Sequence, residues 1–243
     1  MSLIVRRDGA VLTLALDRPD AGNRLDGAII DLLTEAFESA GTQQDPPAVI
    51  VLTAMGDDFS LGRERVPGAP QNPPAITAEF QRIQRLNEAV QRCAAVTVAG
   101  LTGRAEGAGL SLAARCDIVV VADDAQLSFP EIPHGIPPTI VLSHYRYVLS
   151  RAILGDLIYT GRVLDGAEAV QFGLAARSVP RHRVSAEVQQ IAGQVTGYDQ
   201  ASIALVKDFL SRTEAVPPTE APGLGIAMYA VEMADRAGRT HRE

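Results

Sequence analysis

Two nearly uninterrupted apolar runs, at residues 48–53 and 96–101, constrain the fold of this 243-residue chain more than any other feature. A strand with one wet face alternates apolar and polar side chains, whereas a strand covered on both faces is apolar along its length. Both runs have the length of a strand, and a polar, glycine-containing turn follows each of them. The first run therefore predicts a strand covered on both faces, and the second predicts a further strand, in an α/β fold.

The segments before the second run predict a hairpin and two helices. Asp8-Gly9 suits the tight turn of a hairpin between short strands at 3–7 and 11–17. Asp26 is placed to cap a helix whose apolar positions recur at helical spacing. A second amphipathic helix is expected from Ile76. It follows a loop from about 54 to 74, whose later half contains prolines that exclude regular structure, at 67, 70, 73 and 74.

The rest of the chain predicts two further strands and then helices only. The strands are expected at 117–122 and 126–129, and the helices at 139–150, 151–158, 165–172, 183–197, 200–213 and 219–236. Because strands dominate the first half and helices the second, we expect repeated ββα-like units closed by a helical region.

Composition and charge exclude several classes of protein. A formal net charge of −7 argues against a nucleic-acid partner, and no apolar run approaches the ~20 residues of a membrane span. The N-terminus has no hydrophobic signal core, so a cytoplasmic protein without a membrane partner is expected. Cys93 and Cys116 lie in apolar stretches and predict buried free thiols. The four histidines show no ligand spacing, and we expect no metal site.

The turns that follow the two apolar runs are candidates for holding a reacting oxygen. Such turns expose backbone N–H groups, and a helix N-terminus adds partial positive charge, so an oxygen that becomes negative is stabilised there. In the turn at 59–64 the candidate donor is the N–H of Arg63, and in the turn at 103–109 it is the N–H of Ala108. The alternative is that both turns serve packing alone. The glycines that flank the two donors are Gly62, Gly107 and Gly109.

Three other kinds of site fit the second turn less well. A dinucleotide-binding turn is disfavoured because Leu112 stands three residues after Gly109, where Gly or Ala is needed. A Walker loop is excluded because no Gly-Lys-Ser/Thr occurs. The segment 109–113 is one residue short of a serine hydrolase elbow, which needs its serine at the strand-to-helix turn. Ser111 falls inside the expected helix, so we expect a polar pocket wall.

Glu131 is the acid best suited to move a proton. Pro130 and the proline-rich segment 133–138 restrict its backbone, and its sequence neighbours are largely apolar. A partly desolvated carboxyl group has a raised pKa, which suits proton transfer near neutral pH. The alternative is a surface glutamate that caps a loop. His134 lies in the same turn and is a candidate pocket residue.

Taken together and in this order, these segments resemble the crotonase superfamily, that is, the enoyl-CoA hydratase/isomerase family. Asp17-Arg18-Pro19 with Asn23-Arg24-Leu25 is similar to the family's early segment, and 49–53 with 59–64 is similar to its first oxyanion loop. The resemblance runs from about residue 3 to 180. Its remaining motifs lie at 103–109, 116–118, 129–132, 135–138, 160–162, 167–169 and 172–174.

The resemblance implies an architecture, a substrate and roles for the candidate residues. It implies a crotonase-like spiral of ββα units over 1–183, which holds the active site. The region 184–243 would be helical and form oligomers, a homotrimer or a hexamer built as a dimer of trimers. The substrate would be an acyl-CoA thioester, with CoA present only as part of the substrate and no separate cofactor. The N–H groups of Arg63 and Ala108 would form the oxyanion hole. Contacts with CoA would come from Arg24, Leu61 and Arg63.

Two departures from the family pattern bear on activity. A hydratase of this family uses two glutamates, but Ser111 stands at the first position and only Glu131 remains. A serine hydroxyl is no comparable base without a partner, whereas one carboxylate can remove an α-proton and return it at the γ-carbon. Double-bond isomerisation is therefore favoured. The alternatives are hydration, decarboxylation or carbon–carbon bond hydrolysis through the same enolate, or a catalytically silent acyl-CoA-binding protein. The last helix also lacks the family's closing segment.

Overall fold

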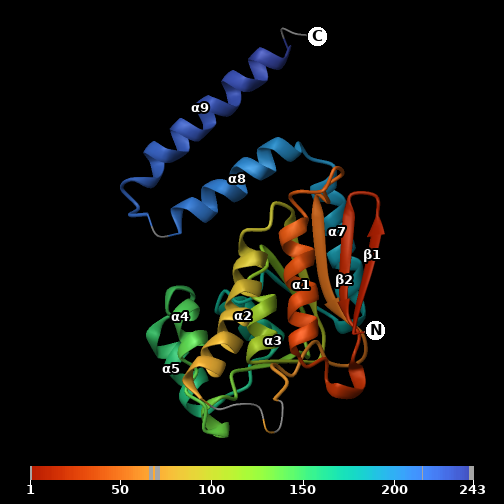
Figure 1. Ribbon diagram of the computed structural model, residues 1–243, viewed down its shortest axis with the longest axis vertical. Coiled ribbons are helices and arrows are strands. Elements are labelled where there is room, and N and C mark those ends of the chain that lie inside the picture. Colours follow the sequence, from red (N-terminus) through yellow and green to blue (C-terminus); the bar gives the residue numbers. More distant parts are fainter. Residues whose placement is uncertain (1, 66–67, 69–71, 215, 241–243) are drawn as a thin grey trace. The chain divides into compact units, whose positions relative to one another are not determined.

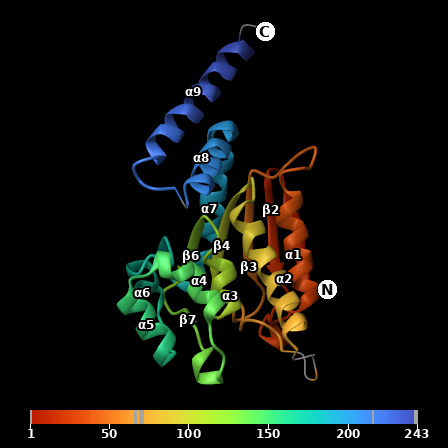
Figure 2. The same cartoon turned by 60° about the vertical axis from the view of Figure 1, so that its left-hand side comes forward.

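The computed structural model describes residues 2–65, 68, 72–214 and 216–240 (Figure 1). The two apolar runs are neighbouring strands in the middle of its main sheet (Figure 2). They form β3 (Val49–Ala54) and β4 (Val96–Leu101), which pair in parallel. Every residue of β4 is buried, as are the first four of β3. The prediction that the first run is a strand covered on both faces is confirmed, and the second run is buried in the same way.

A six-stranded sheet in the order β1-β2-β3-β4-β6-β8 organises the first of two compact units, Met1–Thr196. The expected hairpin, β1 (Leu3–Asp8) with β2 (Val11–Leu16), forms its antiparallel edge, and all later strands pair in parallel. The remaining strands of this sheet are β6 (Ile118–Ala122) and β8 (Arg177–Val179), and a small parallel sheet pairs β5 (Arg104–Glu106) with β7 (Gln126–Ser128).

Helices provide the crossovers between the parallel strands and cover the sheet. α1 (Gly27–Ser39) and α2 (Pro73–Gln91) pack against each other on one face, and α7 (Val184–Thr196) packs against β3, β4 and β6 on the other (Figure 2). The predicted cap of α1 is confirmed, because Asp26 Oδ1 accepts from Ile29 N at 2.8 Å. The other helices of this unit are α3 (Ala108–Ala113), α4 (Thr139–Val148), α5 (Arg151–Thr160) and α6 (Gly166–Gln171).

The first compact unit extends to the end of α7. α7 belongs to it because the side chains of Val184 and Val188 lie against Gly100 of β4. The second unit, Gly197–Glu243, contains α8 (Gln200–Thr213) and α9 (Ala221–Thr240). Within it, Arg236 of α9 forms an ion pair with Asp199, which caps α8.

Three local expectations are corrected. α2 begins at Pro73 rather than Ile76, because Asn72 Oδ1 accepts from Ala75 N at 3.0 Å and proline is well suited to a first helical turn. β5 lies where a turn was expected, and β8 lies in a stretch expected to hold only helices. The prolines at 67 and 70 lie outside the described residues. The expected burial of Cys93 and Cys116 is confirmed.

Candidate active site

The two glycine-containing turns lie side by side. Glu106 N donates to Ser60 O at 2.9 Å, and Phe59 N donates to Arg104 O at 3.0 Å, so backbone hydrogen bonds join the segments. Gly62, with φ of +80°, sits at the closest approach. A Cβ atom there would lie 3.1 Å from Glu106 O and 3.7 Å from Ala108 N. The first turn therefore reaches the start of α3, as the two-donor prediction requires.

Both predicted donors have N–H groups that are available to a ligand. Leu25 N donates to Gly62 O and Glu64 N donates to Leu25 O, both at 2.9 Å. These two hydrogen bonds form a parallel bridge between Leu25 and Arg63. In this arrangement the N–H of Arg63 points away from Leu25. Ala108 is the first residue of α3, and a helix leaves its first N–H groups without intrahelical acceptors. Within the described part of the chain, neither N–H donates to a protein acceptor.

Glu131 lies against the second turn. A Cβ atom on Gly107 would stand only 2.8 Å from Glu131 Oε1, and Gly107 has a φ of +48°. Because glycine has no Cβ atom, position 107 leaves room for the Glu131 carboxylate next to the start of α3. The side chain makes no N-cap hydrogen bond to the short 3-10 helix that follows it, Ile132–His134.

Burial raises the pKa of Glu131. The carboxylate of Glu106 raises it further, whereas a backbone hydrogen bond and His134 lower it. Glu131 Oε2 is buried and has no hydrogen-bond partner among the described residues. A desolvated carboxylate is a stronger base than an exposed one. Beside two backbone donors, it is suited to removing a proton from a carbon next to a carbonyl group whose oxygen binds to those donors.

Ser111 and Tyr145 provide the other polar atoms near Glu131. Ser111 N donates to Gly107 O at 2.9 Å, so Ser111 lies one helical turn along α3, and only 7% of it is exposed. Tyr145 of α4 is fully buried, and its ring centroid lies 4.8 Å from that of Phe129. Ser111 Oγ and Tyr145 Oη both lack a hydrogen-bond partner of ordinary geometry in the described structure. The sequence marked α4 as a helix, but no motif singled out Tyr145.

Burial also dominates the acid–base character of Tyr145. It raises the pKa of the phenol to about 12, with the Ser111 hydroxyl lowering it and the Glu131 carboxylate raising it. Tyr145 is therefore a neutral hydrogen-bond donor at physiological pH. These effects require Ser111, Glu131 and Tyr145 to be close in space.

His134 stays within its own turn. Its Nδ1 lies 2.6 Å from Pro130 O, and the side chain is exposed. The turn is closed by His134 N and Ile136 N, which both donate to Glu131 O. His134 thus lies near Glu131, while its ring nitrogen is engaged by the carbonyl of Pro130.

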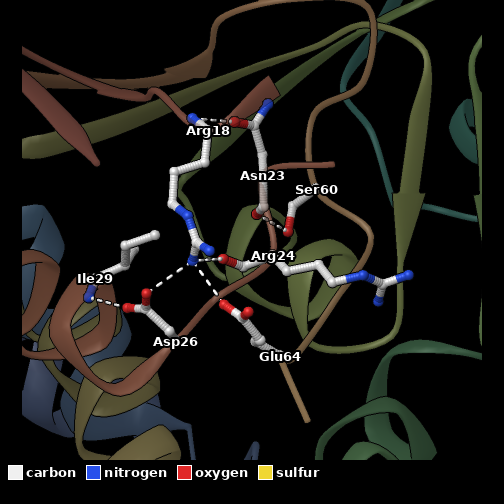
Figure 3. Close-up of polar contacts among 7 residues, drawn as sticks. All are labelled: Arg18, Asn23, Arg24, Asp26, Ile29, Ser60 and Glu64. Carbon is white, nitrogen blue, oxygen red and sulfur yellow. Dashed lines mark hydrogen bonds and ion pairs between the residues drawn. The ribbon is translucent and has the colours of Figure 1, made fainter. Parts of the chain in front are cut away.

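Arg24 and Leu61 are adjacent at the edge of the first turn, because the Arg24 guanidinium donates to Leu61 O. Figure 3 shows that this side chain points away from the cluster in which Arg18 holds Asp26 and Glu64 at 2.7 and 2.6 Å. In the part of the chain that the structure describes, Arg24 forms no ion pair, so its charge remains available to an anion. The Arg63 guanidinium, in contrast, is paired with Glu79 of α2.

Two other structural features fall outside this site. An open groove between α1 and α2, lined by charged side chains such as Glu38 and Arg85, contains none of the predicted site residues. In the described ranges, no group of three metal-ligating side chains is present, and no helix is long and apolar enough to cross a membrane.

Comparisons with known proteins cover nearly the whole chain. A family model described as "Enoyl-CoA hydratase/isomerase" matches residues 6–226. A Mycobacterium tuberculosis (strain CDC 1551 / Oshkosh) protein named as a probable enoyl-CoA hydratase is 30% identical over 213 residues, 87% of this chain and 81% of the relative. The carnitinyl-CoA dehydratase of Escherichia coli (strain K12) is 29% identical over 230 residues, 90% of this chain and 84% of the relative.

The structural comparison agrees with the sequence comparison. The crystal structure of an enoyl-CoA hydratase from Mycobacterium smegmatis matches with a TM-score of 0.90 at 26% identity, covering 97% of this chain and 92% of that chain. The family model also extends beyond residue 180, where the resemblance in the sequence motifs ended.

Proposed function

The chain belongs to the enoyl-CoA hydratase/isomerase family of acyl-CoA enzymes, and from that premise we propose that it shifts the double bond of an enoyl-CoA with one carboxylate. The close approach of the two turns supports this proposal: a Cβ atom on Gly62 would lie 3.7 Å from Ala108 N, which favours the N–H groups of Arg63 and Ala108 as the two donors of an oxyanion hole. The observation that carries the isomerase proposal is Ser111, a hydroxyl at the position where a hydratase of this family has the first of its two glutamates.

The proposed reaction needs only proton transfers. The thioester oxygen accepts from the N–H groups of Arg63 and Ala108. Glu131 takes the α-proton of a β,γ-unsaturated thioester, and the electron pair of the C–H bond passes into the dienolate, with negative charge on the bound oxygen. Glu131 then returns the proton to the γ-carbon, and the double bond comes to lie between the α- and β-carbons. No atom is gained or lost.

The raised pKa of Glu131 supports this role. A carboxylate whose pKa lies closer to neutrality is a stronger base than an ordinary carboxylate and removes the α-proton more readily, and the acid so formed then returns the proton to the γ-carbon. CoA enters as part of the substrate, and we propose Arg24 as a contact for its phosphates. Arg63 contributes through its backbone, because its side chain is paired with Glu79.

Turnover of a small enoyl-CoA panel tests the reaction type. We expect 3-enoyl-CoA thioesters to give 2-enoyl-CoA products of unchanged mass, followed by chromatography with mass detection and assigned by NMR. A main product heavier by one water would identify a hydratase, and loss of carbon dioxide or chain cleavage would identify another enolate reaction. Binding without any turnover would support the silent-binder alternative.

Hydration is the second candidate, because the relatives of this chain are named as a hydratase and a dehydratase. In that case Glu131 alone would have to activate water, since no carboxylate stands at position 111. The same panel distinguishes this possibility directly by product mass.

A further inference from the structure

The N–H of Arg63 takes its direction from a single parallel bridge that lies outside the named strands. Leu25 N donates to Gly62 O, and Glu64 N donates to Leu25 O, both at 2.9 Å. In a trans peptide the C=O and N–H groups point in opposite directions, so the hydrogen bond on Gly62 O turns the Arg63 N–H away from Leu25. The N–H of Ala108, in contrast, is oriented by α3. The first donor therefore depends on two hydrogen bonds to residue 25.

Arg18 joins the two sides of this bridge through their side chains. Asp26 follows Leu25 and Glu64 follows Arg63, so the two carboxylates lie directly after the bridged residues. One guanidinium nitrogen of Arg18 contacts Asp26 Oδ2 at 2.7 Å and Glu64 Oε2 at 2.6 Å (Figure 3). The side chains of Arg18, Asp26 and Glu64 are 26%, 31% and 34% exposed. Salt screens such partly buried pairs less than pairs on the open surface.

The backbone of Arg18 is fixed as well. Arg18 N donates to Asn23 Oδ1 at 2.8 Å, and Asn23 N donates to Arg18 O at 2.9 Å. Asn23 is fully buried, and its Nδ2 donates to the carbonyl oxygens of Met55 and Asp58 at 2.9 and 2.8 Å. The guanidinium of Arg18 therefore extends from a rigid base.

Removal of the Arg18 guanidinium would leave the carboxylates of Asp26 and Glu64 facing each other across the bridge. Like charges at this separation repel each other. The repulsion would act on the two residues that directly follow Leu25 and Arg63. A bridge of two hydrogen bonds, without the further pairs of a sheet, offers little resistance to it.

We propose that Arg18 is a positioning residue for the oxyanion hole. By holding Glu64 beside Asp26, it keeps the N–H of Arg63 directed at the thioester oxygen, and it does so without contacting the substrate. The inference rests on the proposed function in one respect, namely that the Arg63 N–H is an oxyanion donor. It does not depend on the reaction that the enolate undergoes afterwards.

Two ligands that differ at the thioester oxygen test this role. We would compare butyryl-CoA with the thioether butyl-CoA, in which CH₂ replaces the carbonyl group, by calorimetry on the full chain. The parent protein is expected to bind butyryl-CoA about 10-fold more tightly, because two N–H groups pair with its oxygen. Arg18→Met should lower this ratio about 5-fold, the effect of one hydrogen bond, and leave the affinity for butyl-CoA nearly unchanged.

The rate of α-hydrogen exchange is the second readout. With butyryl-CoA at saturation in deuterated water, Arg18→Met should slow exchange about 10- to 100-fold, because a displaced donor costs less than the loss of one. Arg18→Lys should keep the affinity ratio and the exchange rate within about 2-fold of the parent values. A single nitrogen contacts both carboxylates, and an ammonium group also provides a single cationic nitrogen.

Arg85→Met is the matched control. Arg85 of α2 donates two hydrogen bonds at 2.8 Å to Glu38, which lies near the opposite end of α1 from Asp26. Its loss removes an ion pair between helices and should leave the affinity ratio and the exchange rate unchanged. If Arg18→Met does not fold, as judged by circular dichroism, Glu64→Ala replaces it with the same expectation, since it removes the same contact from the side of the turn.

Each outcome decides the question. An unchanged affinity ratio in Arg18→Met, or equal weakening of both ligands, would overturn the inference, as would an equal loss in Arg85→Met or Arg18→Lys. A parent protein that binds both ligands equally would refute the two oxyanion donors and this inference with them. The enoyl-CoA panel decides the reaction type separately. If the parent protein hydrates enoyl-CoA and Arg18→Met lowers the ratio, the isomerase proposal fails and this inference stands.

Discussion

Glu131 links proton chemistry to stability, because burial holds its pKa above the ordinary value of 4.5. The folded state then binds this proton more tightly than the unfolded state does. The contribution of Glu131 to the free energy of unfolding is greatest while its carboxyl group is protonated. This contribution falls as pH rises from about 4.5 through the raised pKa of the folded state. Catalysis requires the opposite form, since only the ionised carboxylate removes an α-proton.

Glu131→Gln is therefore expected to stabilise the protein at pH 8 and to change little at pH 4. Glutamine cannot ionise, so the variant does not lose stability over the pH range in which Glu131 is deprotonated. We expect a rise in Tm of about 1–2 °C at pH 8, since partial exposure of the side chain reduces the effect. Calorimetric unfolding at both pH values measures it. A lower Tm at pH 8 would show that the ionised carboxylate is stabilising.

The same substitution should abolish proton exchange. If Glu131 is the sole acid and base, Glu131→Gln slows exchange of the α-hydrogens of a bound acyl-CoA by about 10²- to 10⁴-fold or more, with nearly unchanged binding. NMR in deuterated water follows the exchange. Glu106→Gln is the control, because Glu106 acts on the pKa of Glu131 only from a distance. Unchanged exchange in the Glu131 variant would direct attention to His134 and Glu64.

Ser111→Glu tests whether a second carboxylate converts the chemistry. A glutamate one turn along α3 would face Glu131 and provide a group that orients and deprotonates water, so hydration of 2-enoyl-CoA should rise. Ser111→Gln is the matched control, since it has the same size without the charge. A folded Ser111→Glu variant that binds acyl-CoA and gains no hydration would mean that position 111 does not face the reacting carbons.

The turn that precedes α3 leaves the space in which the Glu131 carboxylate lies. Gly107→Ala is expected to displace Glu131, because the new Cβ would meet Oε1 at 2.8 Å, and to impose strain at a φ of +48°. Gly173→Ala provides the control, because Gly173 has a φ of +79° and nothing lies within 4 Å of a Cβ there. Both variants should lose about 1–2 kcal/mol of stability by denaturant unfolding, but only Gly107→Ala should lose α-proton exchange.

The elements that the sequence predicted well are those with a strong local signal. β3 and β4 are continuous apolar runs, and the cap of α1 is an aspartate directly before an apolar face. β5 and β8 contain three residues each, which is too short for any periodicity to be recognised. They are strands because parallel neighbours, β7 and β6, pair with them.

The candidate site was predictable to the extent that its groups lie in turns. Gly62, Ala108 and Glu131 each occupy a glycine- or proline-containing segment, and the structure brings these segments together. Tyr145 differs because it lies on a helix with Tyr147 two residues later, and the sequence contains no sign that one ring is buried and the other exposed. Its role depends on contacts with Phe129 and Ser111, which only the three-dimensional structure provides.

For the whole molecule, apolar side chains on the second unit raise the question of assembly. Val206 and Leu210 of α8 are 56% and 60% exposed, and Ile226 and Tyr229 of α9 are 71% and 61% exposed. A concentration of large exposed apolar side chains on two helices is typical of an interaction surface. We propose that this surface joins copies of the chain into a homotrimer or a dimer of trimers.

Light scattering after size-exclusion chromatography tests this assembly. The parent protein is expected to elute with the mass of three or six chains. Val206→Glu and Ile226→Glu should each shift it towards monomer, because a carboxylate buried at an interface pays a large desolvation cost without a partner. Gln190→Glu on the exposed side of α7 adds the same charge outside this surface and should leave the mass unchanged. A monomeric parent protein would refute the proposed assembly, whereas intact oligomers in both variants would place the interface on other elements.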